Sequence, residues 1–254
     1  MLELQVLLSA DRLQHWLVAL LINGALIAAA QRLPLLTPAG WVHAGVLGTL
    51  LLGSLGWPGW WAVVLYLALG SLVTRLGFRR KQEQGLAEAR GGRRGPENVW
   101  GSAATGAALA LLCVLPSAPM LLLQFGFAAS FAAKLADTCG SEIGKRWGRH
   151  TLLITTLRPV PPGTEGAISA EGTLASLVGS ALMALVMLEL GLLQGFSGWL
   201  LVSVVGLAAT LLESLIGAGL QQRCQWLSNE LVNALQTLIA ALLAMLLASQ
   251  LGLA

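Results

Sequence analysis

Charged residues are scarce in this chain: they make up 11% of its 254 residues, against about 25% in a typical soluble domain. Hydrophobic residues make up 56%. A soluble enzyme with an ordinary hydrated surface is excluded by this balance. The composition instead predicts an integral membrane protein with several spans.

Sequence motifs of common soluble enzymes are also missing. The chain contains no GxxxxGK[ST] phosphate loop, no Rossmann fingerprint, no HExxH, no GxSxG and no HRD or DFG kinase motif. Its three histidines are isolated, and its three cysteines (Cys113, Cys139 and Cys224) lack CxxC spacing. These absences argue against a zinc site, a disulfide framework and a serine hydrolase.

Long apolar runs account for most of the chain. Each is close to the length needed to cross about 30 Å of hydrocarbon. The run at 41–56 is short and rich in glycine, so seven spans and a re-entrant segment are the alternative to eight. The N-terminus lacks the basic region and cleavage site of a signal peptide, so we expect the first run to remain as an anchor. We predict one all-α domain over residues 1–254, a polytopic bundle of seven or eight transmembrane helices. The runs lie at about 13–30, 41–56, 58–76, 99–116, 118–136, 171–192, 196–217 and 229–252.

Basic residues predict the orientation of this bundle. With eight spans, the basic loops at about 77–98 and 145–170 lie on one side together with Arg32 and Arg223, and Arg12 lies alone on the other. The side rich in lysine and arginine faces the cytoplasm, which places both termini outside. The basic charge is thus a topology signal, and nucleic acid is not an expected partner.

The segment KLADTCGSEIGK (residues 134–145) places carboxylates, hydroxyls and amines within an apolar surrounding. At 100° per residue its polar side chains share one helix face. The alternative is a solvated face with salt bridges at i,i+3 spacing. The run begins inside an apolar stretch and contains Gly140 and Gly144, which favours a ligand that approaches closely. The polar residues on this face are Lys134, Asp137, Thr138, Ser141, Glu142 and Lys145.

Other polar segments fall on the same side of the membrane. Ser169 is expected to cap the sixth span, with Glu171 in its first turn. For the stripes on the seventh and eighth spans, hydrogen bonds between helices are the alternative, and for the arginine-rich loop it is contact with anionic lipid. Together the segments predict one pocket for a metal-bound polyphosphate. They contribute Lys81, Arg94, Glu97 and Asn98; Gly163, Thr164, Glu165 and Gly166; Gly172 and Thr173; Thr210, Glu213, Ser214, Gly217 and Gln221; and Asn229, Glu230 and Asn233.

Five blocks of the sequence, in order, resemble the integral membrane family DUF92. That family includes phytyl-phosphate kinases of plants and cyanobacteria, and is related to CTP-dependent kinases of polyprenols, dolichol and phytol. The resemblance covers most of the chain from about residue 40 onward. At Glu213 many members carry Asp, which keeps the charge but changes the reach. The blocks are RGPENVWGSA (94–103), ADTCGSEIGK (136–145), PPGTEGAISAEGT (161–173), ESLIGAGLQ (213–221) and NELVN (229–233).

The resemblance implies a Mg²⁺-dependent kinase. It would transfer a phosphoryl group from a nucleoside triphosphate, CTP or UTP rather than ATP, to an isoprenoid monophosphate such as phytyl phosphate. The implied catalytic residues are Asp137, Glu142, Glu171 and Lys145, and the implied Mg²⁺ ligands are Asp137, Glu142, Glu171 and Glu213. The implied substrate and nucleotide contacts are Lys134, Thr138, Ser141, Gly163, Thr164, Glu165, Gly166, Ser169, Gly172, Thr173, Lys81, Arg94, Glu97, Asn98, Ser214, Gln221, Asn229 and Asn233.

Two other functions are left open by the residues. A phytol or polyprenol kinase would act on the alcohol with the same site, using Asp137 or Glu171 as base. A transporter of small solutes or lipids would place polar groups at the bilayer centre and relate two halves of the chain. The sequence also leaves open a homodimer, and it does not choose between a plasma membrane and a thylakoid.

Overall fold

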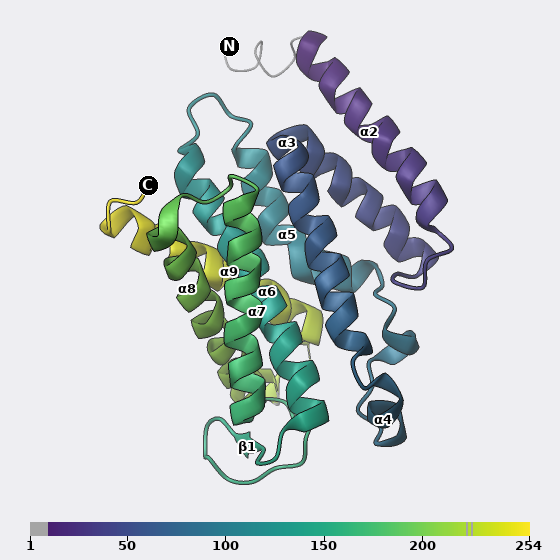
Figure 1. Ribbon diagram of the computed structural model, residues 1–254, viewed down its shortest axis with the longest axis vertical. Coiled ribbons are helices and arrows are strands. Elements are labelled where there is room, and N and C mark those ends of the chain that lie inside the picture. The colour runs from purple at the N-terminus through teal and green to yellow at the C-terminus, as the bar shows by residue number, and fades with distance from the viewer. Residues whose placement is uncertain (1–9, 222, 225) are drawn as a thin grey trace.

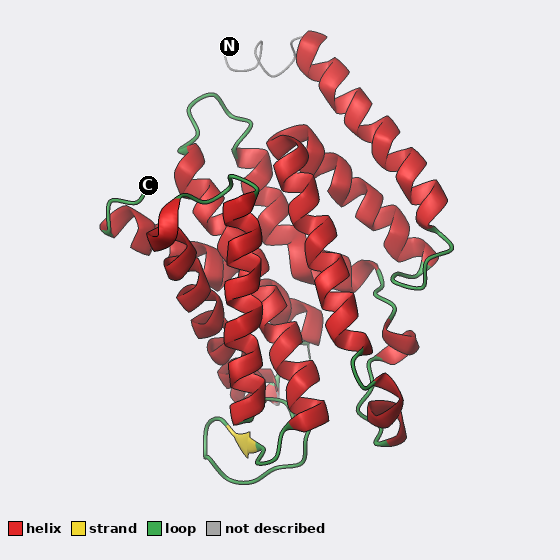
Figure 2. Cartoon of the chain, in the orientation of Figure 1, coloured by secondary structure: helices red, strands yellow, loops and turns green. Residues whose placement is uncertain are grey.

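The protein is almost entirely helical (Figures 1 and 2). The computed structural model describes residues 10–221, 223, 224 and 226–254. Its helices are α2 (Ala10–Ala30), α3 (Pro38–Arg75), α4 (Phe78–Glu83), α5 (Pro96–Leu112), α6 (Met120–Trp147), α7 (Ala170–Glu189), α8 (Gly195–Ile216) and α9 (Asn229–Gln250), with a 3₁₀ turn η1 (Ala89–Gly92) and a π-helical turn η2 (Gly217–Gln221). The strands β1 (Leu152–Leu153) and β2 (Ala167–Ile168) form one short antiparallel pair.

Helix α3 is a hairpin of two helical arms. Gly56 has φ of +66° and interrupts the helical backbone, and Pro58 follows it. Unbroken, 38 residues would extend about 57 Å, far more than one membrane crossing needs. In Figure 1 the two arms instead fold back from a common end. They correspond to the predicted runs at 41–56 and 58–76, so the first of these is a helical arm.

The predicted fold class is confirmed. Six helices are long and apolar enough to cross a membrane. Counting both arms of α3 and adding α5, which has 17 residues, gives eight crossings in the described part of the chain. The connections at 76–95 and 148–169 therefore lie on the same side of the bundle, towards the lower end in Figure 1.

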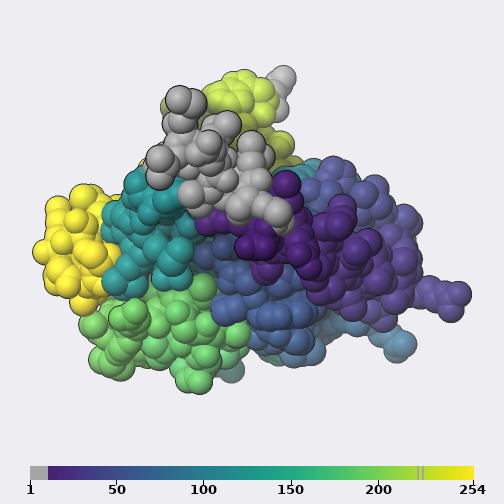
Figure 3. Space-filling model, turned by 90° about the horizontal axis from the view of Figure 1, so that it is seen from above, coloured from purple at the N-terminus to yellow at the C-terminus, as the bar shows by residue number. Residues whose placement is uncertain are grey.

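Helix α6 is the central element. Phe125, Phe127 and Phe131 on this helix are fully buried, and α5, α7, α8 and α9 all pack around it. By contrast α2 packs along α3 and keeps most of its surface exposed. Figure 3, a view from above, shows α2 and the C-terminal residues at opposite sides of the molecule. The burial of α6 carries its polar lower half into the interior.

Candidate active site

A cavity of about 350 Å³ opens at the lower end of the bundle. Its walls come from α3, α5, α6, α7, α8 and α9 and from the loops before α5 and α7. The lining is mostly polar, and most of the predicted site residues contribute to it. These are Arg94, Asn98, Lys134, Asp137, Thr138, Ser141, Glu142, Lys145, Gly163, Thr164, Glu165, Gly166, Ser169, Gly172, Thr173, Glu213, Ser214, Asn229 and Asn233.

All six polar residues predicted on one face of α6 line the cavity. Lys134 forms an ion pair with Asp137 one turn further along, and its Nζ also donates to Oδ1 of Asn233 on α9 at 2.8 Å. Thr138 Oγ1 donates to the Lys134 carbonyl at 3.0 Å. Because Lys134 is only 6% exposed, the alternative of a solvated helix face is excluded at this residue.

Gly140 and Gly144 have a packing role in addition to lining the cavity. A Cβ on Gly140 would lie 2.1 Å from Ser176 Oγ and 3.2 Å from the Gly172 carbonyl oxygen of α7. A Cβ on Gly172 would in turn lie 2.9 Å from the Gly140 carbonyl oxygen. Small residues thus let the backbones of α6 and α7 approach closely. The close approach inferred for these glycines from the sequence is, at least in part, that of a neighbouring helix.

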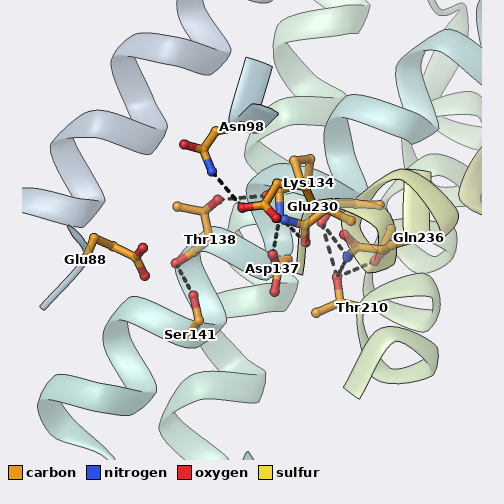
Figure 4. A network of polar contacts seen from close by, with 12 residues as sticks. Glu88, Asn98, Lys134, Asp137, Thr138, Ser141, Thr210, Glu230 and Gln236 are labelled. Carbon is orange, nitrogen blue, oxygen red and sulfur yellow. Dashed lines mark hydrogen bonds and ion pairs between the residues drawn. The ribbon is translucent and has the colours of Figure 1, made fainter. Parts of the chain in front are cut away.

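The deep end of the cavity is a network of side chains from four helices (Figure 4). Asn98 Nδ2 on α5 donates to Glu230 Oε1 on α9 at 3.4 Å. Thr210 Oγ1 on α8 and Gln236 Nε2 on α9 both donate to the Ala133 carbonyl, each at 3.2 Å. That carbonyl directly precedes Lys134. The network therefore fixes the turn of α6 that carries the lysine.

Arg94 enters the cavity from the loop before α5. Its backbone pairs with the loop before α3, where Thr37 N donates to the Arg94 carbonyl at 3.0 Å. The guanidinium lies against Tyr66, 5.3 Å from the ring centroid, and fits there because a Cβ on Gly70 would come within 2.5 Å of it. Its Nη1 is buried without a hydrogen-bond partner among the described residues. An unsatisfied buried donor of this kind is costly unless a ligand pairs with it.

Two loops meet at the mouth of the cavity. Lys145 Nζ at the end of α6 lies 3.0 Å from Glu88 Oε1 in the loop before α5. A Cβ on Gly163 would lie 2.8 Å from Leu86 Cδ2, so the loop before α7 touches the same segment. Burial alone would raise the pKa of Glu88, but the charge and hydrogen bond of Lys145 outweigh it and hold that pKa below its usual value. Glu88 is therefore an ionised partner for Lys145 at neutral pH.

The start of α7 is built as predicted. Ser169 caps the helix, and its Oγ accepts from Gly172 N at 3.1 Å. Glu165, in the preceding loop, also lines the cavity. Burial raises the pKa of Glu165, and the negative charges of Asp137 and Glu88 add to the rise against the opposing charge of Lys145. This loop thus brings a further acid close to the charged face of α6.

Of the residues with an implied catalytic, metal-binding or ligand-binding role, four do not line the cavity. Lys81 is fully buried beside it, where its Nζ pairs with Glu142 and donates to the Thr74 carbonyl at 2.9 Å. Lys81 therefore anchors α4 to α6. Its partner Glu142 lines the cavity, but the carboxylate of Glu142 is buried in the pair with Lys81. The prediction that Lys81 contacts the ligand is not supported, because its side chain is fully buried outside the cavity lining and its ammonium is paired with Glu142 and the Thr74 carbonyl.

The other three lie outside the cavity for local reasons. Glu171 lies on the outer side of the first turn of α7, with an oxygen 4.0 Å from Arg149 Nε. Glu97 forms an exposed ion pair with Arg90. Gln221 lies in η2, and its buried Oε1 has no hydrogen-bond partner among the residues that the structure describes. Of these, Glu171 is the largest departure, since the sequence placed it among both the catalytic residues and the metal ligands.

The predicted metal ligands are only partly brought together. In the described residues no group of three or more His, Cys, Asp or Glu side chains is arranged to hold a metal ion. Glu142 is paired with Lys81, and Glu171 is outside the cavity. Asp137 and Glu213 both line the cavity, and Glu213 lies close enough to Asp137, Lys134 and Glu165 to interact with their charges. Asp137 and Glu213 are thus the carboxylates best placed for a metal-bound phosphate.

Some lining residues had no catalytic, metal-binding or ligand-binding role assigned from the sequence. Glu88 is the most important: it resembles any solvated acid of a charged loop, and its partner Lys145 is 57 positions away. Thr210 and Glu230 carried a signal, since they share helix faces with Glu213 and Asn233. Tyr66, Ser102, Thr151 and Ser176 also line the cavity. Tyr66, the single tyrosine of the sequence, lies in an apolar run, where no neighbouring polar motif marks it as a site residue.

Comparison with known proteins places the chain in a family. The sequence model of the family described as "Integral membrane protein DUF92" matches residues 21–241. The chain belongs to the DUF92 integral membrane family. It is 47% identical over 232 residues to an uncharacterized membrane protein of Synechocystis sp., covering 90% of each chain. Membership confirms the resemblance inferred from the five sequence blocks.

Two further relatives come from distant organisms. The chain is 39% identical over 217 residues to "Protein VTE6, chloroplastic" of Arabidopsis thaliana, covering 84% of this chain and 65% of the relative. It is 30% identical over 239 residues to an uncharacterized membrane protein of Methanocaldococcus jannaschii, covering 91% and 93%. No solved structure matches the chain.

Proposed function

We propose that this protein is a prenyl phosphate kinase, which transfers a phosphoryl group from a nucleoside triphosphate to an isoprenoid monophosphate. One observation carries the proposal: Lys134, Lys145 and Arg94 line a single cavity together with Asp137 and Glu213, at one end of a membrane bundle. Cations bind phosphates, and carboxylates bind the metal that accompanies a nucleotide. The resemblance to the phytyl-phosphate kinases of the family supports the choice of phytyl phosphate as acceptor.

The location of the cavity suits two substrates of opposite solubility. An isoprenoid tail partitions into the bilayer, and its phosphate is held near the membrane surface. A nucleotide arrives from water through the loops at the same end of the bundle. Charged groups inside a membrane are costly and are kept where they have a function. The cavity offers both substrates one shared polar chamber.

The reaction needs alignment more than it needs a base. An oxygen of the acceptor phosphate forms a bond to the γ-phosphorus of the donor, and the bond from that phosphorus to the bridging oxygen breaks. The electron pair leaves with the nucleoside diphosphate, and the product is the isoprenoid diphosphate. Because the attacking oxygen is already anionic, no proton has to be removed. Lys134, Lys145 and Arg94 would hold the reacting phosphates in line and offset their charge.

The residues present fit a bound Mg²⁺. This ion is usually held by one or two carboxylates together with phosphate oxygens and water, so a cluster of three protein ligands is not required. Asp137 and Glu213, close enough to interact electrostatically, would supply the carboxylates. When bound, the ion would neutralise charge on the donor phosphates. Asp137 also keeps Lys134 in place through its ion pair.

The finer assignments rest on the family resemblance. They are CTP or UTP as donor, and a plasma membrane or a thylakoid as the location. We also propose that the cavity opens to the cytoplasm, because the basic loops lie at that end. None of these choices alters the roles of the lining residues.

The test is a matched pair of assays on protein purified in detergent. One offers phytyl phosphate and the other phytol, each with Mg²⁺ and with CTP, UTP, ATP and GTP in turn. We expect diphosphate from the monophosphate, reduced on the order of 100-fold by Asp137→Asn. Asp11→Asn, at the exposed start of α2, is the control and should retain activity. Phosphorylation of phytol alone would show that the protein is an alcohol kinase. No turnover of either substrate by folded protein would favour a transporter.

A further inference from the structure

Two lysines on α6 occupy the same face at different depths. Lys134 and Lys145 both line the cavity, and the 11-residue separation within α6 corresponds to a rise of about 16 Å with nearly the same direction around the helix. Each lysine has its own acid, Asp137 for the first and Glu88 for the second. The two lysines of α6 therefore place an ammonium group at two different depths of the cavity.

The deep position is enclosed by membrane helices. Asn233 of α9 accepts from Lys134, while Asn98 of α5 and Glu213 of α8 line the cavity beside it. Thr210 and Gln236 hold the backbone just before this lysine. A ligand whose phosphate reaches Lys134 would be surrounded by spans, where an apolar tail can continue into the bilayer.

The mouth position is enclosed by water-exposed loops. Glu88 comes from the loop before α5, and its side chain is 49% exposed, whereas the side chain of Lys145 is 22% exposed. Gly163, Thr164 and Glu165 come from the loop before α7. Figure 4 shows Glu88 standing apart from the network around Lys134. A ligand at Lys145 would be surrounded by segments that a water-soluble molecule can reach directly.

We infer that the cavity holds two separate phosphate subsites, a deep one at Lys134 for the phosphate of the isoprenoid and a mouth one at Lys145 for the polyphosphate of the nucleotide. This assignment rests on the proposed function. Glu88 then occupies the place of the donor's phosphate when no nucleotide is bound, and one anion exchanges for another as the nucleotide enters. The exchange involves no covalent step.

The main test measures binding of each ligand separately, so it does not depend on turnover. Mg²⁺-CTP and phytyl phosphate are titrated in detergent against the full-length protein and two variants. Lys145→Met should raise the Kd for Mg²⁺-CTP about tenfold or more, as expected for loss of a charged hydrogen bond. The Kd for phytyl phosphate should stay within twofold of the wild-type value. Lys134→Met should do the reverse. Arg80→Met, on the exposed side of α4, is the control and should leave both unchanged.

Lys134 is buried in an ion pair, so Lys134→Met could weaken binding by disturbing the fold. A second variant tests the deep subsite without removing this lysine. Asn233→Ala keeps the lysine and its charge but removes the amide that orients it. Asn233→Ala should weaken the binding of phytyl phosphate severalfold, while the affinity for Mg²⁺-CTP stays within twofold of the wild-type value. Thermal unfolding of each variant verifies that the bundle is intact.

Glu88 gives an independent measurement at the mouth. Glu88→Gln removes the competing anion, so it should tighten nucleotide binding severalfold, and this gain should vanish when Lys145 is also Met. Glu83→Gln, an exposed acid on α4, is the matched control. If Glu88→Gln does not tighten nucleotide binding, the proposed exchange of Glu88 for the nucleotide phosphate at Lys145 is wrong.

The outcomes separate this assignment from the proposed function. If Lys134→Met and Lys145→Met each weaken both ligands alike, or with the preferences reversed, the two-subsite assignment is wrong although the kinase can still be correct. If the wild-type protein binds neither ligand, both proposals fail.

Discussion

Arg94 carries a buried guanidinium nitrogen that lacks a hydrogen-bond partner in the described structure. Lys134 and Lys145 each pair with an acid, whereas Arg94 forms no ion pair with any acid in the described residues and lies against the ring of Tyr66. Arg94 thus offers a ligand a buried nitrogen that is not already used within the described residues. A planar guanidinium can bind two phosphate oxygens at once, which an ammonium cannot do in the same geometry.

We predict that Arg94→Ala lowers kcat/KM for the nucleotide about 10- to 100-fold, the range expected for a charged hydrogen bond of about 1.5–3 kcal/mol. Arg94→Lys should recover only part of this loss, because it restores the positive charge but not the two parallel N–H donors of the guanidinium. Steady-state kinetics on purified protein measure the effect, and Arg79→Ala on α4 serves as control. Equal activity of Arg94→Ala and wild type would remove Arg94 from the site.

The buried pair of Lys81 and Glu142 gives a prediction about stability. The two side chains are 0% and 3% exposed, and breaking such a pair leaves an uncompensated buried charge. Lys81→Met should lower the free energy of unfolding by about 3–5 kcal/mol, and adding Glu142→Leu should recover much of that loss. Thermal unfolding in detergent follows both variants. If Glu142→Leu alone abolishes turnover at unchanged stability, Glu142 has the catalytic role that the sequence assigned to it.

At the scale of elements, the sequence predicted the helices well and their contacts less well. Apolar runs and breakers act locally, so the spans, the break near Gly56 and the Ser169 cap were all predictable. The pairing of Lys81 with Glu142 was not, because 61 positions separate them and nothing local selects a partner. The same holds for the short β1–β2 pair, whose two strands frame a loop with no alternating pattern.

The contact between α6 and α7 depends on residue size at their crossing. A methyl group on Gly172 would press on the Gly140 carbonyl oxygen at 2.9 Å, which neither backbone can easily avoid. Gly172→Ala should therefore destabilise the protein by about 1–3 kcal/mol and, by shifting the polar face of α6, reduce activity as well. Gly24→Ala on α2, where a Cβ meets nothing within 4 Å, is the matched control and should be neutral or slightly stabilising. Equal stability of the two variants would contradict this packing argument.

At the scale of the whole molecule, the polar groups are distributed unequally between the two ends. The cavity and the loops with most of the basic residues share one end, while Arg12 lies towards the other and donates to the Val114 carbonyl at 2.8 Å. Transporters bind near the bilayer midplane between related halves. A cavity lined by the loops of one end favours chemistry on a membrane-anchored substrate.

The same asymmetry predicts how the protein sits in the membrane. Lysine and arginine near the spans stay in the cytoplasm, so the loop with α4 should face inward and the α7–α8 connection outward. In a background without the three native cysteines, Gln82→Cys and Gln194→Cys place one exposed thiol at each end. When the protein is expressed in the plasma membrane of a bacterial host, a membrane-impermeant maleimide should label position 194 in intact cells, and position 82 only after permeabilisation. The opposite pattern would place the cavity outside, away from the cellular nucleotide pool, and would rule out a kinase that draws on cytoplasmic nucleoside triphosphates.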